Sequence, residues 1–301
     1  MSRENNKSHV FLRNMHTSAN RGKEEELKEY RFAVIPKNIN NIFFHEVRDG
    51  CVEEALIQSQ ETHANVTCIF VGPNTTDEGE LTTKLQIQIL DDIIHKKTAY
   101  HGVSIAVNNA QELTPKINEA VTAGIPVITF DSDAPDSTRI RTVGTNNTAF
   151  GEMLGKMLLQ LEPKGGNYSI ISTKPALNLE KRVEGIKKKL NDWDSNWILN
   201  DVFDGKGSVK GSLDAMKQSM KEYPNQKVII PVGSWPMVDV ERWNEFVGNH
   251  MDLLTVVGGA TDPQIKALKH LKVDALVGQM PFLMGKLSIC EFQPVFILFV
   301  L

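Results

Sequence analysis

With 301 residues, the chain is long enough for two lobes of ordinary size, each burying a core of its own. Hydrophobic residues make up 41% and charged residues 23% of it, as in a globular protein, and the net charge of -4 gives no basic field for nucleic acid. Three widely spaced cysteines without a CxxC pair are not typical of a disulfide framework or a zinc site, and they leave only a Cys51–Cys68 pair open.

Residues 1–30 are polar and charged, and we predict that they form a polar N-terminal arm outside the fold. They contain no apolar segment of signal-peptide length, and no stretch of the chain reaches the roughly 18 apolar residues of a membrane span. Beyond the arm, apolar runs of strand length alternate with segments of helical periodicity. The first half is predicted to contain strands at 32–35, 67–72, 101–107, 127–130 and 140–144, and helices from about 41, at 81–95 and at 111–124.

The same alternation continues through the second half of the chain. Predicted helices lie at 149–161, 179–190, 207–223, 238–248 and 262–271, and predicted strands lie at 167–172, 197–203, 228–232, 254–257 and 275–277. Regular alternation of strand and helix indicates an α/β fold with parallel, doubly wound sheets and right-handed crossovers. We therefore expect two doubly wound lobes joined by a hinge near 143–147. In the first helix, Phe44, Val47, Cys51 and Leu56 are expected to face the core.

The strand at 127–130 ends directly at Asp131, Ser132 and Asp133. In open α/β sheets, ligands bind at the carboxyl ends of strands, where loops from neighbouring strands converge. A carboxylate at this position can accept two hydroxyl hydrogens in charge-assisted bonds. The alternative is that Asp131 forms an Asx turn or a helix cap. A catalytic acid/base pair of Asp131 and Asp133 is the less favoured hypothesis.

Side-chain amides and aromatic rings follow the first predicted strand, at Asn41, Phe43 and Phe44. Amides bond to hydroxyl groups and flat rings cover C–H faces, so this combination suits a hydroxylated ligand. The alternative is that Asn41 caps the helix and the two rings belong to the core. Two consecutive helical positions cannot both face inward, which favours a ligand contact for Phe43 over Phe44.

Arg182 lies in the first turns of the helix predicted at 179–190. It can reach a cleft at the strand ends, or it can pair on the surface with Glu180 or Glu184. Because Arg182 and Asp131 come from different lobes, closure of the lobes would bring both to one ligand. The chain contains none of the common nucleotide-binding, zinc-protease or serine-hydrolase motifs, and its eight histidines lack metal spacing. We therefore expect no catalytic residue, no metal and no cofactor.

Seven short motifs occur along the chain in a characteristic order. They are NNIFF (40–44), RDG (48–50), AGIPVITFDSDAP (123–135), VGTNN (143–147), RVEGIKKKL (182–190), VVGG (256–259) and VDALVGQMPFLMG (273–285). In this order and at this spacing they resemble the type 1 periplasmic binding proteins of the ribose-binding, sugar-transport family, over residues 31–289. The sequence departs from that family at Ser132, where ribose binders carry arginine, and at Ala260, where many members carry a ligand-binding aspartate. The residues after 285 are also unlike the family, and the export signal is absent from this chain.

The resemblance implies a lobe 1 of residues 31–145 plus 279–301, a lobe 2 of residues 146–278, and a second hinge segment at 277–279. It implies a monomeric, non-catalytic protein of the periplasm or cell exterior that binds a small sugar or polyol for an ABC-type importer. A membrane permease or a sensor would be its partner. The ligand-binding residues that it implies, with Ser132 added beside Asp131, are Asn41, Phe43, Phe44, Asp131, Arg182, Phe203 (or Asp204), Trp235 and Gln279.

Two other functions are compatible with the same family fold. A ligand-sensing receptor domain would share the binding chemistry and differ in its output. A regulator of the lac-repressor class would need a helix-turn-helix before residue 31, and residues 1–30 hold too few apolar residues for one, so such a protein would lack its DNA-binding domain.

Overall fold

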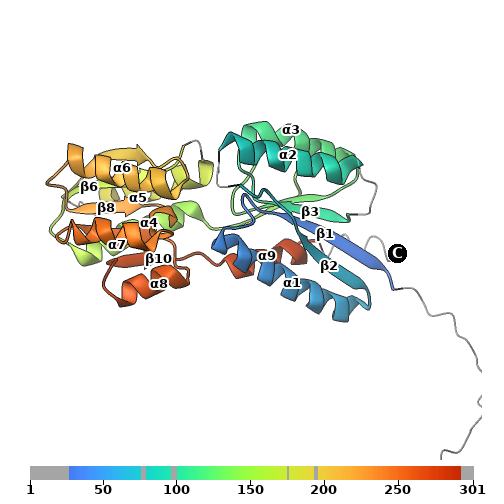
Figure 1. Ribbon diagram of the computed structural model, residues 1–301. Coiled ribbons are helices and arrows are strands. Elements are labelled where there is room, and N and C mark those ends of the chain that lie inside the picture. Colours follow the sequence, from blue (N-terminus) through green and yellow to red (C-terminus); the bar gives the residue numbers. More distant parts are fainter. Residues whose placement is uncertain (1–26, 76–78, 96–99, 175, 193–195, 293–301) are drawn as a thin grey trace, which may run out of the picture.

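The computed structural model describes residues 27–75, 79–95, 100–174, 176–192 and 196–292 (Figure 1). Most of the predicted N-terminal arm, residues 1–26, lies outside the described residues. The prediction that the arm extends to residue 30 is wrong, because β1 begins at Glu29 and the Tyr30 side chain is 4% exposed. Tyr30 packs into the core of the first lobe, so the fold begins earlier than the sequence indicated. Among the described residues, no helix is both long and apolar enough to cross a membrane.

The first lobe is built on a parallel five-stranded sheet of order β2-β1-β3-β4-β5. Its strands are β1 (Glu29–Ile35), β2 (Asn65–Phe70), β3 (Gly102–Ile105), β4 (Val127–Phe130) and β5 (Arg141–Val143), and its helices are α1 (Ile42–Thr62), α2 (Glu80–His95), α3 (Ala110–Thr122) and α9 (Pro281–Cys290). Side chains alternate across β1, so Phe32 and Val34 pack towards α1 and α9, whereas Ala33 and Ile35 pack towards α2 and α3. Both faces of the sheet are therefore covered, as parallel sheets require (Figure 1).

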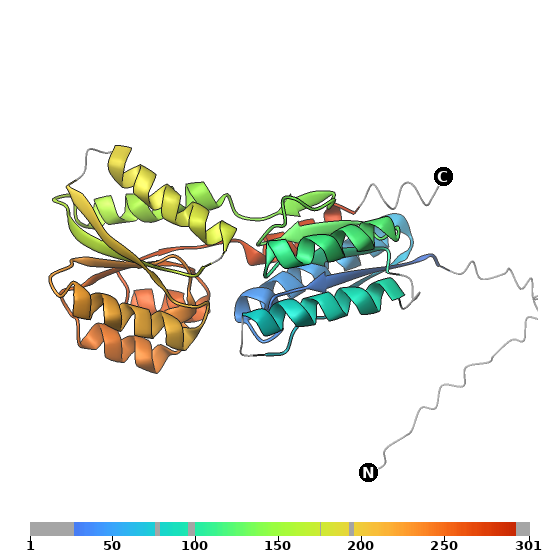
Figure 2. The same cartoon turned by 90° about the horizontal axis from the view of Figure 1, so that it is seen from above.

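The second lobe repeats this architecture with the sheet order β10-β9-β8-β6-β7. Its strands are β6 (Gly166–Ser172), β7 (Trp197–Asp204), β8 (Val228–Pro231), β9 (Leu254–Gly258) and β10 (Ala275–Val277), and its helices are α4 (Asn147–Leu161), α5 (Leu177–Asp192), α6 (Val209–Glu222), η1 (Trp235–Met237), α7 (Val240–Gly248) and α8 (Asp262–Lys269). The helices α4 and α5 cover one face, and α6 and α7 cover the other. The chain crosses between the lobes after β5 and again after β10 (Figure 2). The prediction of two doubly wound parallel α/β lobes is thus confirmed.

The inward face of α1 differs in one position from the predicted stripe. Phe44, Val47 and Cys51 are buried as predicted, but Leu56 is 61% exposed. The helical period of 3.6 residues places Ala55, four residues after Cys51, on the buried face instead. The buried face of α1 therefore includes Ala55 and not Leu56.

Helix α9 was not predicted, and it returns the chain to the first lobe, where it packs on α1 (Figure 1). The two helices approach at backbone distance through Gly50 on α1 and Gly285 on α9. A Cβ atom at position 50 would collide with the carbonyl oxygen of Phe282, and one at position 285 would collide with that of Val47. Glycine is therefore required at both positions for this helix pair to form.

The structure joins Cys51 on α1 to Cys68 on β2 in a disulfide, the pair that the sequence left open. Cys290, on α9, is a free thiol that donates a hydrogen bond to the Glu54 carboxylate at 3.0 Å. Burial and the neighbouring Glu54 raise the pKa of the Cys290 thiol to about 12, which keeps it protonated at neutral pH.

Reduction of the disulfide is expected to lower the free energy of unfolding by about 2–4 kcal/mol, because a crosslink spanning 17 residues restricts the unfolded chain. Chemical denaturation with and without a reductant measures this difference. A Cys290→Ala variant should respond to the reductant as the wild type does, whereas a Cys51→Ala, Cys68→Ala double variant should not respond. A response in the double variant would mean that the reductant acts elsewhere.

Candidate ligand-binding site

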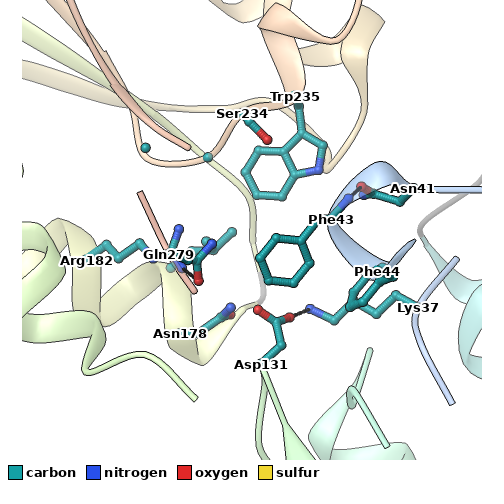
Figure 3. A pocket seen from close by; sticks show the side chains of 13 residues that line it. Lys37, Asn41, Phe43, Phe44, Asp131, Asn178, Arg182, Ser234, Trp235 and Gln279 are labelled. Atoms are coloured by element: carbon teal, nitrogen blue, oxygen red, sulfur yellow. Dashed lines mark hydrogen bonds and ion pairs between the residues drawn. The ribbon is translucent and has the colours of Figure 1, made fainter. Parts of the chain in front are cut away.

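A cleft lies where the two lobes meet, at the carboxyl ends of strands from both sheets (Figure 3). It contains about 580 Å³ of space not filled by protein atoms, open solvent included. Its lining residues are Lys37, Asn41, Phe43, Phe44, Asp131, Asn178, Leu179, Arg182, Gly233, Ser234, Trp235, Gly258 and Gln279. Most of these residues lie just after a strand or at the start of the helix that follows it, which is where the sequence predicts a binding site.

Asp131 reaches the cleft because the backbone turns sharply at the end of β4. Its φ of 59° is left-handed, a conformation that aspartate adopts more readily than most residues, and its N–H donates to the Val143 carbonyl at 2.9 Å. The carboxylate lies 3.4 Å from the Nζ atom of Lys37, which follows β1. Figure 3 shows the carboxylate between Lys37 and Asn178. Lobe 1 thus presents an acceptor for hydroxyl groups.

An aromatic wall faces Asp131 from the start of α1. The Asn41 side chain accepts a hydrogen bond from the Phe43 N–H at 3.0 Å and so caps the helix, and it also lines the cleft. Phe44 is 3% exposed and packs edge-on against Phe130 in the core, with ring centroids 6.1 Å apart. Phe43 projects into the cleft, with its ring edge-on to that of Phe44 (Figure 3). Both interpretations of this segment therefore hold: it caps the helix, and it lines the cleft.

Arg182 enters the cleft from lobe 2 and is 3% exposed. Its Nε–H donates to Asn147 Oδ1 at 2.8 Å, and its terminal nitrogens donate to the Val232 carbonyl at 2.8 Å and to Gln279 Oε1 at 2.7 Å. The guanidinium also lies 4.2 Å from the ring centre of Phe150. Burial lowers the pKa of Arg182 to about 10, and the negative charge of Asp131 opposes that shift. The side chain is therefore charged at neutral pH and held rigidly.

Gln279 connects Arg182 to both crossings between the lobes. It follows β10 on the second crossing, and its Oε1 atom accepts from Arg182 and, at 3.0 Å, from the hydroxyl of Thr145 on the first crossing. One amide oxygen thus joins the two predicted hinge segments to the guanidinium. A movement of the lobes about these segments would therefore change the hydrogen bonds of Gln279, including the one from Arg182.

Trp235 overhangs the cleft from the loop that follows β8 (Figure 3). Its indole lies directly over Gly233, where a Cβ atom would collide with the ring. Glycine at this position is what allows the ring to fold back over its own loop. The rings of Trp235 and Phe43 both line the cleft, and aromatic rings suit the C–H face of a sugar ring.

The amino-acid sequence of residues 32–290 matches the protein family described as a periplasmic binding protein domain. The chain belongs to this family. The ribose import binding protein RbsB of Bacillus subtilis is 20% identical over 277 residues, which cover 87% of this chain and 80% of that protein.

Solved structures of periplasmic binding proteins share the fold. A solute-binding protein of an ABC transporter from Burkholderia graminis, in complex with D-arabinose, superposes with a TM-score of 0.75 at 25% identity, covering 89% of each chain. The glucose-galactose binding protein GanP of Geobacillus stearothermophilus has a TM-score of 0.75 at 20% identity, covering 88% of this chain and 90% of that one. At these identities the likeness concerns the architecture and leaves the site chemistry to be argued from this chain.

Two of the predicted ligand-binding residues of this periplasmic binding protein do not line the cleft described above. The Ser132 hydroxyl is buried and donates to the Val107 carbonyl at 2.6 Å, because the left-handed turn at Asp131 directs the next side chain back towards β3. Phe203 is 7% exposed and packs in the core of lobe 2 against Tyr223, with ring centroids 6.3 Å apart. Asp204, the alternative to Phe203, lines an adjoining, outer part of the cleft.

Several lining residues were not predicted from the sequence. Lys37, Asn178 and Ser234 all line the cleft, and each lies within a few residues of a strand end or a helix start. Lys37 lies two residues after β1, which is the same signal that pointed to Asp131 after β4. Among the described residues, no group of three or more His, Cys, Asp or Glu side chains is arranged to hold a metal ion.

Asp133 has a structural role beside the site. Its carboxylate accepts hydrogen bonds from Arg139, Thr129 and Thr142, including one of 2.7 Å from Arg139 Nη2. Burial alone would raise the pKa of Asp133, but the hydrogen bonds from these three side chains outweigh burial and hold the pKa below its usual value. The carboxylate thereby fixes the segment between β4 and β5 from which Asp131 projects.

An Asp133→Asn variant is expected to lose about 1–2 kcal/mol of unfolding free energy at pH 7. Because the folded-state pKa is depressed, the contribution of the carboxylate is complete above its unfolded-state pKa and disappears as pH falls through the folded-state value. The difference between variant and wild type should therefore shrink below about pH 4. Urea denaturation across this pH range measures it. Asp136→Asn, at an exposed position nearby, should leave stability unchanged, and a pH-independent loss at position 133 would contradict the assignment.

Proposed function

We propose that this periplasmic binding protein binds one small hydroxylated molecule, a sugar, a sugar acid or a polyol, between its lobes. It would act as the solute-binding component of an ABC-type importer. The observation that carries the proposal is that Asp131 from one lobe and Arg182 from the other line the same cleft. An acceptor and a donor of hydrogen bonds, in a cleft that the Phe43 and Trp235 rings also line, match the alternating hydroxyl groups and C–H faces of a sugar.

Ligand binding is coupled to closure of the lobes in this proposal. A ligand shifts an equilibrium between open and closed forms only through its greater affinity for the closed form. A ligand that contacts Asp131 and Arg182 together meets this condition, because the two side chains come from opposite lobes. Gln279, bonded to Arg182 and to Thr145, would carry the change to both crossings. The closed form would then be recognised by the permease.

The proposed setting is the periplasm or the cell exterior. The Cys51–Cys68 disulfide supports it, since disulfides form and persist mainly in oxidising compartments. We propose that the protein has no catalytic activity and works as a monomer. Among the described residues, the inner cleft is lined by one carboxylate, that of Asp131, and by no cysteine or histidine that could act as a nucleophile or base.

A thermal-shift screen tests the proposal. Pentoses, hexoses, sugar alcohols and sugar acids are added to the protein, and a ligand should raise the melting temperature by mass action. At a concentration of 100 times Kd the stabilisation is about 2.7 kcal/mol. Calorimetry should then give one ligand per chain, and chromatography should recover it unaltered. Conversion of the ligand to a product, or no binding of any of these compounds, would refute the proposal.

A further inference from the structure

The charges that line the cleft do not cancel. Among its lining residues, Lys37 and Arg182 are cationic and Asp131 is the one carboxylate, which leaves an excess of one positive charge. Asp131 is already 3.4 Å from Lys37, and the two side chains are 10% and 19% exposed. Asp131 thus has its ion-pair partner, Lys37, within lobe 1. Arg182 lies on the opposite side of the cleft, where Asp131 acts on it through space and without an ion-pair contact (Figure 3).

Arg182 is a buried cation that has only neutral acceptors. Its three hydrogen bonds go to the side-chain amides of Asn147 and Gln279 and to the carbonyl of Val232. Within the described part of the chain, no carboxylate oxygen lies within 4.0 Å of its guanidinium, the distance that defines an ion pair. A guanidinium has five N–H groups. Those three bonds leave two N–H groups, one on each terminal nitrogen, without a hydrogen bond to the described residues.

A buried charge without a counter-ion is unfavourable, and a ligand that brings the opposite charge removes that cost. We propose that the ligand is a polyhydroxy acid of monosaccharide size, a uronate or an aldonate, whose carboxylate is received by Arg182. Asp131, held by Lys37, accepts hydroxyl groups at the other end of the molecule. This inference rests on the proposed function and narrows it to one class of sugar derivative.

The size of the charge excess distinguishes a carboxylate from a phosphate. A sugar carboxylate carries one negative charge at neutral pH, which equals the excess of one in the cleft. A phosphate monoester carries about 1.5 to 2 negative charges and would exceed it, placing uncompensated charge beside Asp131. Two N–H groups on one guanidinium also match the two oxygens of a carboxylate. A sugar acid therefore fits this cleft better than a sugar phosphate does.

Matched pairs of ligands test the inference by calorimetry on the full-length protein. Each pair differs at a single carbon and keeps the same ring or open-chain form: D-galacturonate and D-galactose, D-glucuronate and D-glucose, and D-arabinonate and D-arabinitol. In the pair that binds tightest, the acid is expected to bind at least about tenfold more tightly, since charge-assisted bonds are roughly twice as strong as neutral ones. If the neutral sugar binds equally well or better, the inference is wrong and the proposed function stands. If no member of any pair binds but the thermal-shift screen finds another neutral sugar or polyol that does, the inference is wrong and the proposed function stands. If that screen also finds no ligand, both are wrong.

A Lys37→Gln variant tests whether the charge balance is the cause. It removes one cation, so the lining becomes neutral and the unpaired Asp131 opposes an anion. The affinity for the acid should fall at least about tenfold more than the affinity for the neutral sugar, so that the preference for the acid is lost. Lys206→Gln is the control, because Lys206 is exposed in the outer cleft and does not line the inner one. An unchanged preference for the acid in the Lys37 variant would overturn the charge argument.

Discussion

We expect an Asp131→Ala variant to lose the rise in melting temperature that the ligand gives to the wild-type protein. Asp131 supplies the one carboxylate of the cleft lining, and a carboxylate can accept two hydroxyl hydrogens at once. Each hydrogen bond to a charged group contributes about 1.5–3 kcal/mol, so losing two weakens binding by roughly 100-fold or more. At ten times the wild-type Kd, the wild type is about nine-tenths occupied, whereas a variant that binds 100-fold more weakly is about one-tenth occupied.

The backbone conformation of Asp131 requires a second variant. Alanine at a φ of 59° is strained by about 1 kcal/mol, which lowers the stability of the unliganded protein regardless of binding. Asparagine adopts this conformation readily and keeps the shape of the side chain, so Asp131→Asn removes only the charge and one acceptor. It should bind much more weakly than the wild type at nearly unchanged stability.

Asp133→Asn provides the matched control for the site. It removes a carboxylate two residues away that faces Arg139 instead of the inner cleft. We expect this variant to melt at a lower temperature and yet to gain the same ligand-induced rise as the wild type. A full rise in the Asp131→Asn variant, or its loss in Asp133→Asn, would remove Asp131 from the site.

The contact between α1 and α9 gives the largest expected change in stability. In a Gly50→Ala variant the added Cβ atom would collide with the carbonyl oxygen of Phe282, and backbone cannot rotate away as a side chain can. The helices must separate, which uncovers the apolar face of the first lobe. We expect a loss of about 4 kcal/mol in the free energy of unfolding, measured by urea denaturation.

The same substitution at Gly248 is the control. Gly248 is exposed at the last position of α7, and a Cβ atom there would have no other heavy atom within 4 Å. Because alanine favours a helix over glycine, Gly248→Ala should leave the protein unchanged or up to about 1 kcal/mol more stable. The same glycine-to-alanine substitution is thus expected to lower the free energy of unfolding at position 50 and not at position 248. Equal stability of both variants would mean that α1 and α9 do not touch through their backbones.

The order and type of nearly all elements could be predicted because the signals for them are local. The run Val127–Phe130 is apolar on both faces, as expected of a central parallel strand, and it forms β4 with every residue buried. Leu113, Ile117 and Ala120 follow the helical period and are fully buried on α3. Each of these signals depends on a few neighbouring residues. Packing between distant segments therefore did not change the secondary structure that these signals predict.

The site was harder to predict, because strand ends identify a region and not the direction of a side chain. Asp131 and Ser132 are adjacent in the sequence, yet Asp131 lines the cleft and Ser132 donates to the Val107 carbonyl after β3. The cause is the left-handed backbone turn at Asp131, which no residue type in the sequence predicts. Phe203, at the end of β7, points into the core of lobe 2. The only sequence signal for Lys37 is its position two residues after β1. These outcomes depend on packing between distant segments.

The position of α9 also bears on how the polypeptide is assembled at the ribosome. Lobe 2 is encoded without interruption between α4 and β10, so it can fold as soon as that stretch has emerged. The sheet of lobe 1 is synthesised before lobe 2, but Met284, Ile289 and Phe292, which complete the apolar cluster on one of its faces, are synthesised after lobe 2. During translation the part of lobe 1 that α9 covers therefore stays exposed while lobe 2 folds. Chaperone capture should be concentrated in that interval.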